Sequence, residues 1–239
     1  MSIKIWSNDI ANVYVWDTAV KEVYVGTTKV RPTSRLPAAY QEVQYIGANG
    51  TQYIDTGVKW ENKYTVEAKY NPASFAYDAD VCIVWCRWDS WPNYCFFVWL
   101  QRYSSNTPYH CQYLNSNYSH SWWSAYTGVD YEVVSTLKTS WNALVVNWSV
   151  LWTWSYGSSY SVWRNMTIFW ALYQWSLINQ LYWEVYYVRI KNTSDVIVRD
   201  FVPCYRKSDS VVWMYDLVTN QFYTNKWTWT FAKWPDVTS

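Results

Sequence analysis

The sequence predicts an all-β protein whose main part is an antiparallel β-sandwich. Many short segments alternate between apolar and polar residues, as half-buried strands do, and residues 63–70 are a clear example. Turn-forming residues separate these segments at short spacing, and no segment has the periodicity of an amphipathic helix. With 239 residues the chain is long enough for one large β domain and a small additional module.

The beginning of the chain contains three copies of one ten-residue unit. The copies are residues 3–10, 13–20 and 23–30. Each copy has the form of two short strands joined by a tight turn. The turn position holds Trp6 and Trp16 in the first two copies and Gly26 in the third, and glycine is the residue that such a turn favours.

A proline-containing linker follows the repeats. Pro32 favours an extended joint, so we expect a β-repeat module over residues 1–32 and the sandwich domain over residues 33–239. Strand patterns then occur at residues 51–57, 63–70, 131–137, 143–150, 166–169, 184–190 and 196–203. Residues 78–127 are interpreted as an irregular region rich in Ser, Asn, Tyr and Trp.

Tryptophan is abundant in this chain and glycine is scarce, with 21 and 6 residues respectively. An average chain is about 7% glycine, which corresponds to about 17 residues here. Trp148 follows Asn147 between two apolar runs, at a position where a two-residue hairpin turn favours glycine. Our hypothesis is that many tryptophans are UGA codons of a gene whose host reads UGA as glycine. The alternative is a Trp-rich interaction surface.

The charge and hydropathy patterns argue against two classes of partner. A formal net charge of +1 does not favour nucleic acid or an anionic membrane surface. Because the amino-terminal residues lack a basic stretch followed by an apolar run, we expect no signal peptide of the ordinary kind, and no apolar run is long enough to span a bilayer. The chain has five cysteines, which we expect to be reduced thiols: Cys82, Cys86, Cys95, Cys111 and Cys204.

Two long motifs carry a resemblance to a known family when Trp is replaced by Gly. The opening motif comprises residues 36–46 and 49–57, and the closing motif comprises residues 199–207, 214–218, 222–225 and 231–236. Both are similar to laminin-G-like, concanavalin A-like jelly-roll domains found in tail and other structural proteins of phages and prophages. The decapeptides resemble the short VYVG-T repeats that precede such domains. The departures are tryptophans at family glycine positions: Trp170, Trp183, Trp213, Trp227, Trp229 and Trp234.

The resemblance implies a non-enzymatic protein associated with a phage tail. It would have a structural or receptor-binding role, with the jelly roll contacting a glycan or protein of the host surface and other parts contacting tail proteins. Its location would be the virion, or the extracellular surface of a cell. A bacterial adhesin with a lectin-like domain and a glycan-cleaving enzyme are the alternatives, and a homo-oligomer stays open.

Few residues suggest catalysis or a cofactor. Glu67, Glu132 and Glu184 are interpreted as solvated charges on strand faces rather than a catalytic pair, because they lack the spacing of a glycosidase motif. No cysteine pair has the spacing of a structural zinc site, so no metal is expected. Three further acids are interpreted as turn caps, with calcium ligation as the alternative: Asp55, Asp200 and Asp216.

The irregular region is the binding site that the sequence favours. It combines serines with six tyrosines, a composition that forms adaptable contact surfaces and offers rings for stacking on sugars. These candidate ligand-binding residues are Tyr94, Tyr103, Tyr109, Tyr113, Tyr118 and Tyr126. The alternative is a set of variable surface strands and loops with no ligand.

Overall fold

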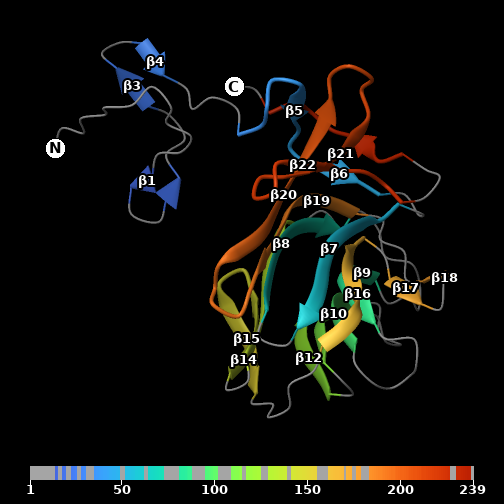
Figure 1. Cartoon of the computed structure of the whole chain (residues 1–239). Helices are drawn as coiled ribbons and strands as arrows, with labels where there is room; N and C mark the ends of the chain where they lie inside the picture. Colours follow the sequence, from blue (N-terminus) through green and yellow to red (C-terminus); the bar gives the residue numbers. More distant parts are fainter. Residues whose placement is uncertain are drawn as a thin grey trace.

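The structure is a computed structural model, and it describes most of the region after residue 34. The described residues are 14–15, 18–19, 23–25, 28–30, 35–48, 52–61, 64–72, 81–87, 95–101, 109–114, 117–124, 129–138, 141–154, 161–169, 171–173, 176–178, 183–226 and 230–237. Every regular element within these ranges is a β-strand (Figure 1). Accordingly, no helix that could cross a membrane is found in the described part of the chain.

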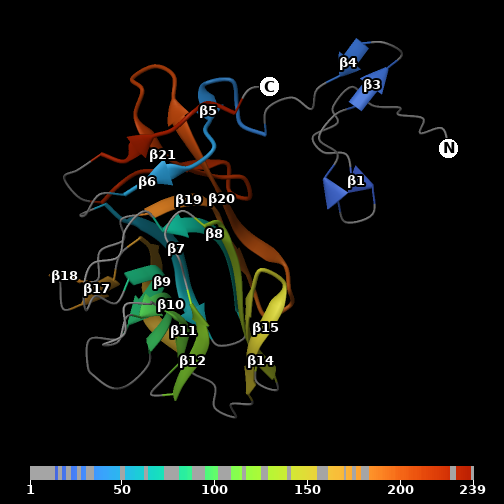
Figure 2. The same ribbon diagram turned by 180° about the vertical axis from the view of Figure 1, so that it is seen from behind.

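The strands form two large antiparallel sheets, which are seen from opposite sides in Figures 1 and 2. The first sheet has six strands in the order β12-β11-β10-β9-β16-β7. Its strands are β7 (Ile54–Glu61), β9 (Val81–Arg87), β10 (Cys95–Gln101), β11 (Tyr109–Leu114), β12 (Asn117–Ser124) and β16 (Ser161–Ile168). Strand β7 is therefore an edge strand, a position that matters for the candidate site.

The second sheet has eleven strands, eight of which follow the order β15-β14-β13-β8-β19-β20-β21-β22. These are β8 (Thr65–Pro72), β13 (Tyr131–Lys138), β14 (Trp141–Val146), β15 (Ser149–Trp154), β19 (Trp183–Lys191), β20 (Ile197–Arg206), β21 (Val212–Asp216) and β22 (Gln221–Tyr223). Three short strands attach to its side: β5 (Tyr40–Glu42), β6 (Ile46–Gly47) and β23 (Ala232–Lys233).

The main hydrophobic core lies between the inner faces of these sheets. Alternate residues of β8, such as Val66 and Ala68, pack with residues of the other sheet, such as Ile83 and Ile168, in one buried cluster. All four are at most 3% exposed. The period-2 alternation predicted for residues 63–70 therefore reflects one face in the core and one face directed away from it.

A smaller core lies on the outer side of the large sheet. Leu36, Val202, Cys204 and Tyr215 form a second buried cluster, and β5 pairs with β20 beside it. Burial raises the pKa of the Cys204 thiol to about 12. Cys86 and Cys204 are both buried, and the reduced state expected for the five cysteines stays a prediction.

The strand predictions outside residues 78–127 are largely confirmed, and the prediction for that region is wrong. Its described residues form four strands, β9 to β12, of the six-stranded sheet. Two apolar runs within it, residues 81–87 and 95–101, are strands of a sheet whose buried side includes Val84 and Cys86. The polar and aromatic residues around them obscured this pattern.

The repeat module shows matching hairpins in its second and third copies. Strands β1 (Tyr14–Val15) and β2 (Thr18–Ala19) pair in the same register as β3 (Val23–Val25) and β4 (Thr28–Val30). A further hairpin is formed by β17 (Ala171–Tyr173) and β18 (Ser176–Ile178). The first copy and the predicted boundary after residue 32 lie outside the described residues.

Candidate functional site

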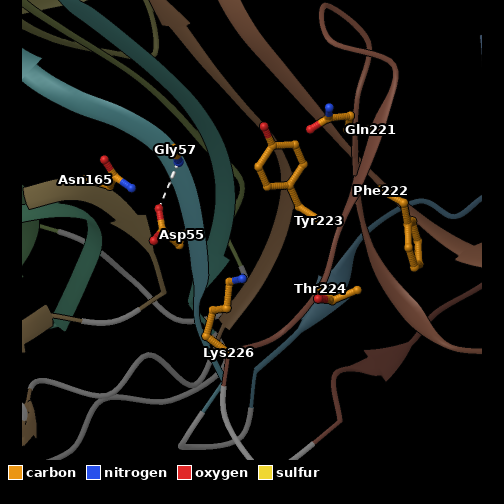
Figure 3. A pocket seen from close by; sticks show the side chains of 8 residues that line it. All are labelled: Asp55, Gly57, Asn165, Gln221, Phe222, Tyr223, Thr224 and Lys226. Atoms are coloured by element: carbon orange, nitrogen blue, oxygen red, sulfur yellow. Dashed lines mark hydrogen bonds between the residues drawn. The ribbon is translucent and has the colours of Figure 1, made fainter.

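A polar pocket of about 320 Å³ lies where edge strand β7 of one sheet approaches edge strand β22 of the other (Figure 3). Its lining comes from three parts of the chain that are more than 50 residues apart in sequence. The lining residues are Asp55, Gly57, Asn165, Gln221, Phe222, Tyr223, Thr224 and Lys226. The pocket therefore exists only when the two sheets are brought together.

Hydrogen bonds attach the segment before β7 to the segment after β22. The Tyr53 amide donates to Oδ1 of Asn225 at 3.0 Å, and the Lys226 amide donates to the Tyr53 carbonyl at 3.3 Å. Nearby, Nε2 of the fully buried Gln52 donates to the Thr230 carbonyl at 2.7 Å. Because buried amide groups are costly to leave unpaired, these bonds hold the two walls of the pocket together.

A bulge in β7 shapes one wall of the pocket. Asp55 is paired with Thr167 and Lys59 with Asn165, so β7 has two more residues than β16 between these pairs. Gly57 lies in this bulge with a φ of 68°, a conformation that glycine adopts at no steric cost. Oδ1 of Asp55 accepts a hydrogen bond from the Gly57 amide at 2.9 Å and stabilises the bulge.

An arginine from the large sheet supports the bulge from the inner side. Nε of Arg199 donates to the Thr56 carbonyl at 3.0 Å and lies 3.5 Å from Oδ2 of Asp216. Asp216 is fully buried, and its carboxylate also accepts hydrogen bonds from the Asp200 amide at 2.8 Å and from Oγ1 of Thr219 at 2.6 Å. Arg199 thus joins β20 to β7 through a fixed guanidinium.

The two aromatic residues of β22 lie on opposite faces of the strand. Figure 3 shows the Tyr223 ring among the other lining side chains and the Phe222 ring directed away from them. Tyr223 makes an edge contact with Phe201, at 5.0 Å between ring centroids, and Phe222 packs against Tyr40 at the same distance. Tyr223 is therefore the aromatic side chain that the pocket presents to a ligand.

The lining has the hydrogen-bonding groups that recognise hydroxyl-rich ligands. Asp55, Asn165 and Gln221 offer carboxylate and amide groups, and Lys226 offers an ammonium donor. Burial, followed by the charge of Asp55, raises the pKa of the neighbouring Tyr53 hydroxyl. Within the described residues, no three His, Cys, Asp or Glu side chains are grouped as a metal site requires.

The tyrosines favoured by the sequence lie in another part of the structure. Tyr94, Tyr103 and Tyr126 lie outside the described residues. Tyr109 and Tyr113 belong to β11 and Tyr118 to β12, and the strand register sets Tyr113 opposite Tyr118. A ligand-binding role for these six tyrosines stays a prediction.

The acids singled out in the sequence have defined structural partners. Two of them cap a turn, as interpreted: Asp55 accepts a hydrogen bond from the Gly57 amide, and Oδ1 of Asp216 accepts one from the Val218 amide at 3.1 Å. Asp200 differs, because its Oδ2 is 3.2 Å from a guanidinium nitrogen of Arg189.

The three glutamates lie on a strand face, as interpreted, but each is half-buried and bonded rather than fully solvated. Glu67 pairs with Arg189 at 3.2 Å and with Lys191. Glu132 accepts from the Tyr187 hydroxyl at 2.8 Å, and Glu184 accepts from the Tyr186 hydroxyl at 3.4 Å. All three lie on neighbouring strands of the large sheet and share its outer side with their partners.

Sequence reasoning missed the pocket as a unit. Asp55 and Gly57 belong to the opening motif, and Tyr223 and Thr224 belong to the closing motif, so the two motifs meet at this site. The sequence marked both motifs but gave no sign that they lie side by side. Asn165 belongs to neither motif, and no local pattern marks it.

The comparisons with known proteins identify the fold. No protein-family model matches the chain, and the search of curated proteins found no match. Among solved structures, a proposed carbohydrate-binding protein from Bacteroides ovatus matches with a TM-score of 0.55 and 13% identity. The match covers 82% of this chain, and the chain spans only 62% of that protein's length.

Two weaker matches belong to animal proteins. The heptameric SAP-like pentraxin of Limulus polyphemus has a TM-score of 0.46 and 14% identity, with 68% of this chain and 79% of that one covered. The mouse laminin alpha1 chain, domains LG4-5, has a TM-score of 0.44 and 9% identity, with 77% and 48% covered. At these identities a match shows the fold alone, and the predicted all-β antiparallel sandwich of jelly-roll type is confirmed.

Proposed function

We propose that this protein binds a carbohydrate without cleaving it and that the pocket between β7 and β22 is a binding site. The observation that supports this function is the grouping of Asp55, Asn165, Gln221 and Lys226 around the Tyr223 ring. Carboxylates and amides pair with sugar hydroxyls, and an aromatic ring packs against the C–H groups of a pyranose. The fold match to a proposed carbohydrate-binding protein supports the same class of ligand.

The pocket wall is prepared before a ligand arrives. The Asp55 carboxylate is fixed by the Gly57 amide, and the bulge is fixed by Arg199 through the Thr56 carbonyl. A site whose groups are already ordered loses less conformational entropy on binding. Lys226 is exposed at the rim, where it can donate to a hydroxyl or a carboxylate of the ligand.

The test is binding to an array of bacterial surface polysaccharides, followed by calorimetry with the oligosaccharide that binds best. Asn165→Ala and Lys226→Ala should each weaken binding by at least about fivefold, because each removes a direct polar contact. Tyr223→Phe keeps the ring and its packing on Phe201 but removes the hydroxyl, so we expect a smaller loss. Lys207→Ala, in an exposed turn, is the matched control.

Two results would contradict the proposal. One is an array on which the wild-type protein binds no glycan. The other is binding that Asn165→Ala and Lys226→Ala leave unchanged, because the ligand would then contact another surface. Equal thermal unfolding midpoints for wild type and variants would exclude loss of fold as the cause.

For the biological setting, we propose attachment of a phage or prophage tail to a glycan or protein of the host surface. The support is the resemblance of both end motifs and of the decapeptide repeats, which would form a separate docking module over residues 1–32. Tail-assembly genes beside this gene are expected. An export or anchoring signal on a longer parent chain would instead favour a surface adhesin.

A glycan-cleaving enzyme is the second candidate because Glu67, Glu132 and Glu184 lie on neighbouring strands of one sheet. Their existing bonds to Arg189, Lys191, Tyr187 and Tyr186 argue against free catalytic carboxylates. The enzyme would require release of reducing sugars from the bound polysaccharide, and this release would disappear in Glu67→Gln or Glu132→Gln. Binding without release favours the non-catalytic function.

We also propose that glycine stands at several tryptophan positions of the natural protein. Trp148 supports this, because it has a φ of 67° in the two-residue turn between β14 and β15 and is 88% exposed. Asn147 has a φ of 46°, so the turn is of the type that favours Asn-Gly. Trp213 supports it less directly, through a buried indole N–H without a partner. TGG codons at Trp6, Trp16 and Trp148 would contradict the proposal.

A further inference from the structure

Three aromatic side chains form a row on the large sheet, which we name the aromatic row: Tyr186, Tyr45 and Trp234. Tyr186 lies on β19, Tyr45 immediately precedes β6, and Trp234 immediately follows β23. The Tyr45 ring centroid is 5.1 Å from that of Tyr186 and 5.0 Å from that of Trp234. Because β6 pairs with both β19 and β23, the row crosses three adjoining strands.

A bulge in β19 directs Tyr186 into this row. Val185 pairs with Tyr70 and Tyr187 pairs with Lys69, so Tyr186 is an extra residue with no partner in β8. Bulges of this kind change the direction of a side chain and are common beside binding sites. Val185 is fully buried, whereas Tyr186 is half-buried and lies with the polar outer residues.

Polar groups surround the Tyr186 end of the row. The carboxylate of Asp130 accepts from the Tyr186 hydroxyl and from Nδ2 of Asn71, both at 3.0 Å, and pairs with Nζ of Lys69 at 3.1 Å. Nζ of Lys69 also lies 4.8 Å from the centroid of the Tyr186 ring. These side chains remain accessible, with Asp130 45% and Lys69 34% exposed.

The hydroxyls of the row are held in their neutral form. Burial and a hydrogen bond to Glu184 raise the pKa of Tyr45 to about 12. Burial and the hydrogen bond to Asp130 raise the pKa of Tyr186 further above its ordinary value. In the neutral form each hydroxyl hydrogen is already bonded to a carboxylate, Asp130 for Tyr186 and Glu184 for Tyr45, so each tyrosine offers a ligand hydroxyl its oxygen as an acceptor.

We propose that the aromatic row and the polar groups beside it are a second carbohydrate-binding site, which takes an uncharged pyranose. Partly exposed aromatic rings beside a carboxylate, an amide and an ammonium are the groups that contact the two kinds of surface on a sugar ring. Trp234 is 43% exposed, so the row is open to solvent rather than closed like a pocket. An open surface fits a residue within a glycan chain, because the chain can continue on both sides.

The charges at this site select against acidic sugars. Lys69 contributes one positive charge, and Asp130 and Glu184 contribute two negative charges within reach of the two tyrosine hydroxyls. A uronate carboxylate would therefore be repelled. The proposal does not require the pocket between β7 and β22 to bind, since none of the residues named here lines that pocket.

Glycine at position 234 would leave the site in place. Tyr45 and Tyr186 supply the contacts on which the proposal depends, and Trp234 covers one side of the Tyr45 ring. Trp234→Gly would expose that side of Tyr45 to a ligand. We therefore expect Trp234→Gly to keep binding, whereas Tyr45→Ala removes it.

The experiment is saturation-transfer difference NMR on the full chain with methyl glycosides of glucose, galactose and N-acetylglucosamine, and with methyl glucuronide as the charged probe. We expect saturation of ring protons in at least one uncharged glycoside, and a signal for the glucuronide weaker by about fivefold. Tyr45→Ala should reduce the signal by at least about fivefold. Tyr186→Phe keeps the ring, loses the bond to Asp130 and should give a smaller decrease.

Variants of the two sites separate this proposal from the pocket. A signal retained in Asn165→Ala and lost in Tyr45→Ala supports the second site, even if the pocket binds nothing. A signal lost only in Asn165→Ala overturns it, as does a glucuronide signal equal to that of glucose. No saturation of any probe also overturns it. Lys207→Ala should match wild type, and Tyr186→Phe remains informative if Tyr45→Ala does not fold.

Discussion

The two faces of the large sheet use the same strand register for opposite chemistry. On the inner face, Val188 lies opposite Ala68 on β8 and Phe201 on β20, and all three are at most 3% exposed. One residue further along, Arg189 lies opposite Glu67 and Asp200, and the three side chains form ion pairs at 3.2 Å. A shift of one position thus changes a dry apolar contact into a half-buried charge cluster.

This difference separates the contacts that stabilise the sandwich from the outer groups that form the aromatic-row site, whereas the pocket lies at the edges of the two sheets. Apolar contacts on the inner face carry no charge to titrate or to screen, and they hold the sandwich together. The outer face has charged and aromatic groups that can meet a ligand, and its pairs contribute less because water and ions compete with them. Substitutions on the two faces should therefore differ in size and in salt dependence.

The largest effect is expected from Phe201→Ala on the inner face. Phe201 is fully buried and contacts Tyr223, so truncation leaves a cavity between the sheets. We expect the free energy of unfolding to fall by about 3–5 kcal/mol in denaturant titrations. Ile197→Ala, at an exposed end of the same strand, should cost less than about 1 kcal/mol. Similar losses for the two variants would contradict the difference between core and surface.

A smaller effect is expected from Arg189→Ala on the outer face. The substitution leaves Asp200 without its cation, whereas Glu67 keeps Lys191. Because the arginine side chain is 31% exposed, we expect a loss of about 1–2 kcal/mol, which decreases in high salt. A double-mutant cycle with Asp200→Ala measures the coupling. Zero coupling at low salt would mean that the Arg189–Asp200 pair adds nothing to stability.

Trp148→Gly is expected to raise the free energy of unfolding by about 1 kcal/mol. The Trp148 side chain belongs to neither face of the sheet. Its backbone has positive φ and its indole is 88% exposed, so the substitution removes strain without opening a cavity. Thermal unfolding of the two proteins would measure the gain. Asn147→Ala is the contrasting variant. Oδ1 of Asn147 accepts a hydrogen bond from the Glu132 amide at 2.8 Å, so its removal should lower the unfolding midpoint. A loss of stability in Trp148→Gly would contradict the inference that tryptophan strains this turn.

The smallest effect concerns the pH dependence contributed by Asp130. Burial alone would raise the pKa of its carboxyl, but hydrogen bonds from Lys69 and Tyr186 lower it overall. Since the folded pKa lies below the unfolded value of about 3.9, Asp130 stabilises the folded state above that value. This contribution disappears as the pH falls through the folded pKa. The unfolding midpoint of Asp130→Asn should therefore decrease less steeply than that of wild type below about pH 4.

Local patterns were sufficient for most strands of the large sheet. The alternation in residues 63–70 and 184–190 anticipated β8 and β19, and Asn147-Trp148 marked the hairpin between β14 and β15. These features depend on neighbours within a few residues. The alternation also indicated that Glu67 faces away from the core, although its partners could not be inferred because they come from a strand over 120 residues away.

The candidate sites depend on distant pairings that no local pattern records. Asp55, Asn165 and Tyr223 come together only through the closing of two sheets, and Tyr45 meets Tyr186 only because β6 adds to β19. The bulges at Gly57 and Tyr186 depend on how two strands pair, so they are not visible in either strand alone. Residues 78–127 were predicted to bind a ligand because their tyrosine content can be read directly from the sequence, whereas the pairing of distant strands cannot.

The bonds between residues 52–53 and residues 225–230 have a consequence for how the protein is made. One wall of the pocket leaves the ribosome early, and the other follows only after about 170 further residues have been added. A nascent chain can form the centre of the large sheet but cannot yet hold a ligand in the pocket. Ligand capture at this site is thus a property of the finished polypeptide, and glycans met during synthesis would not occupy it.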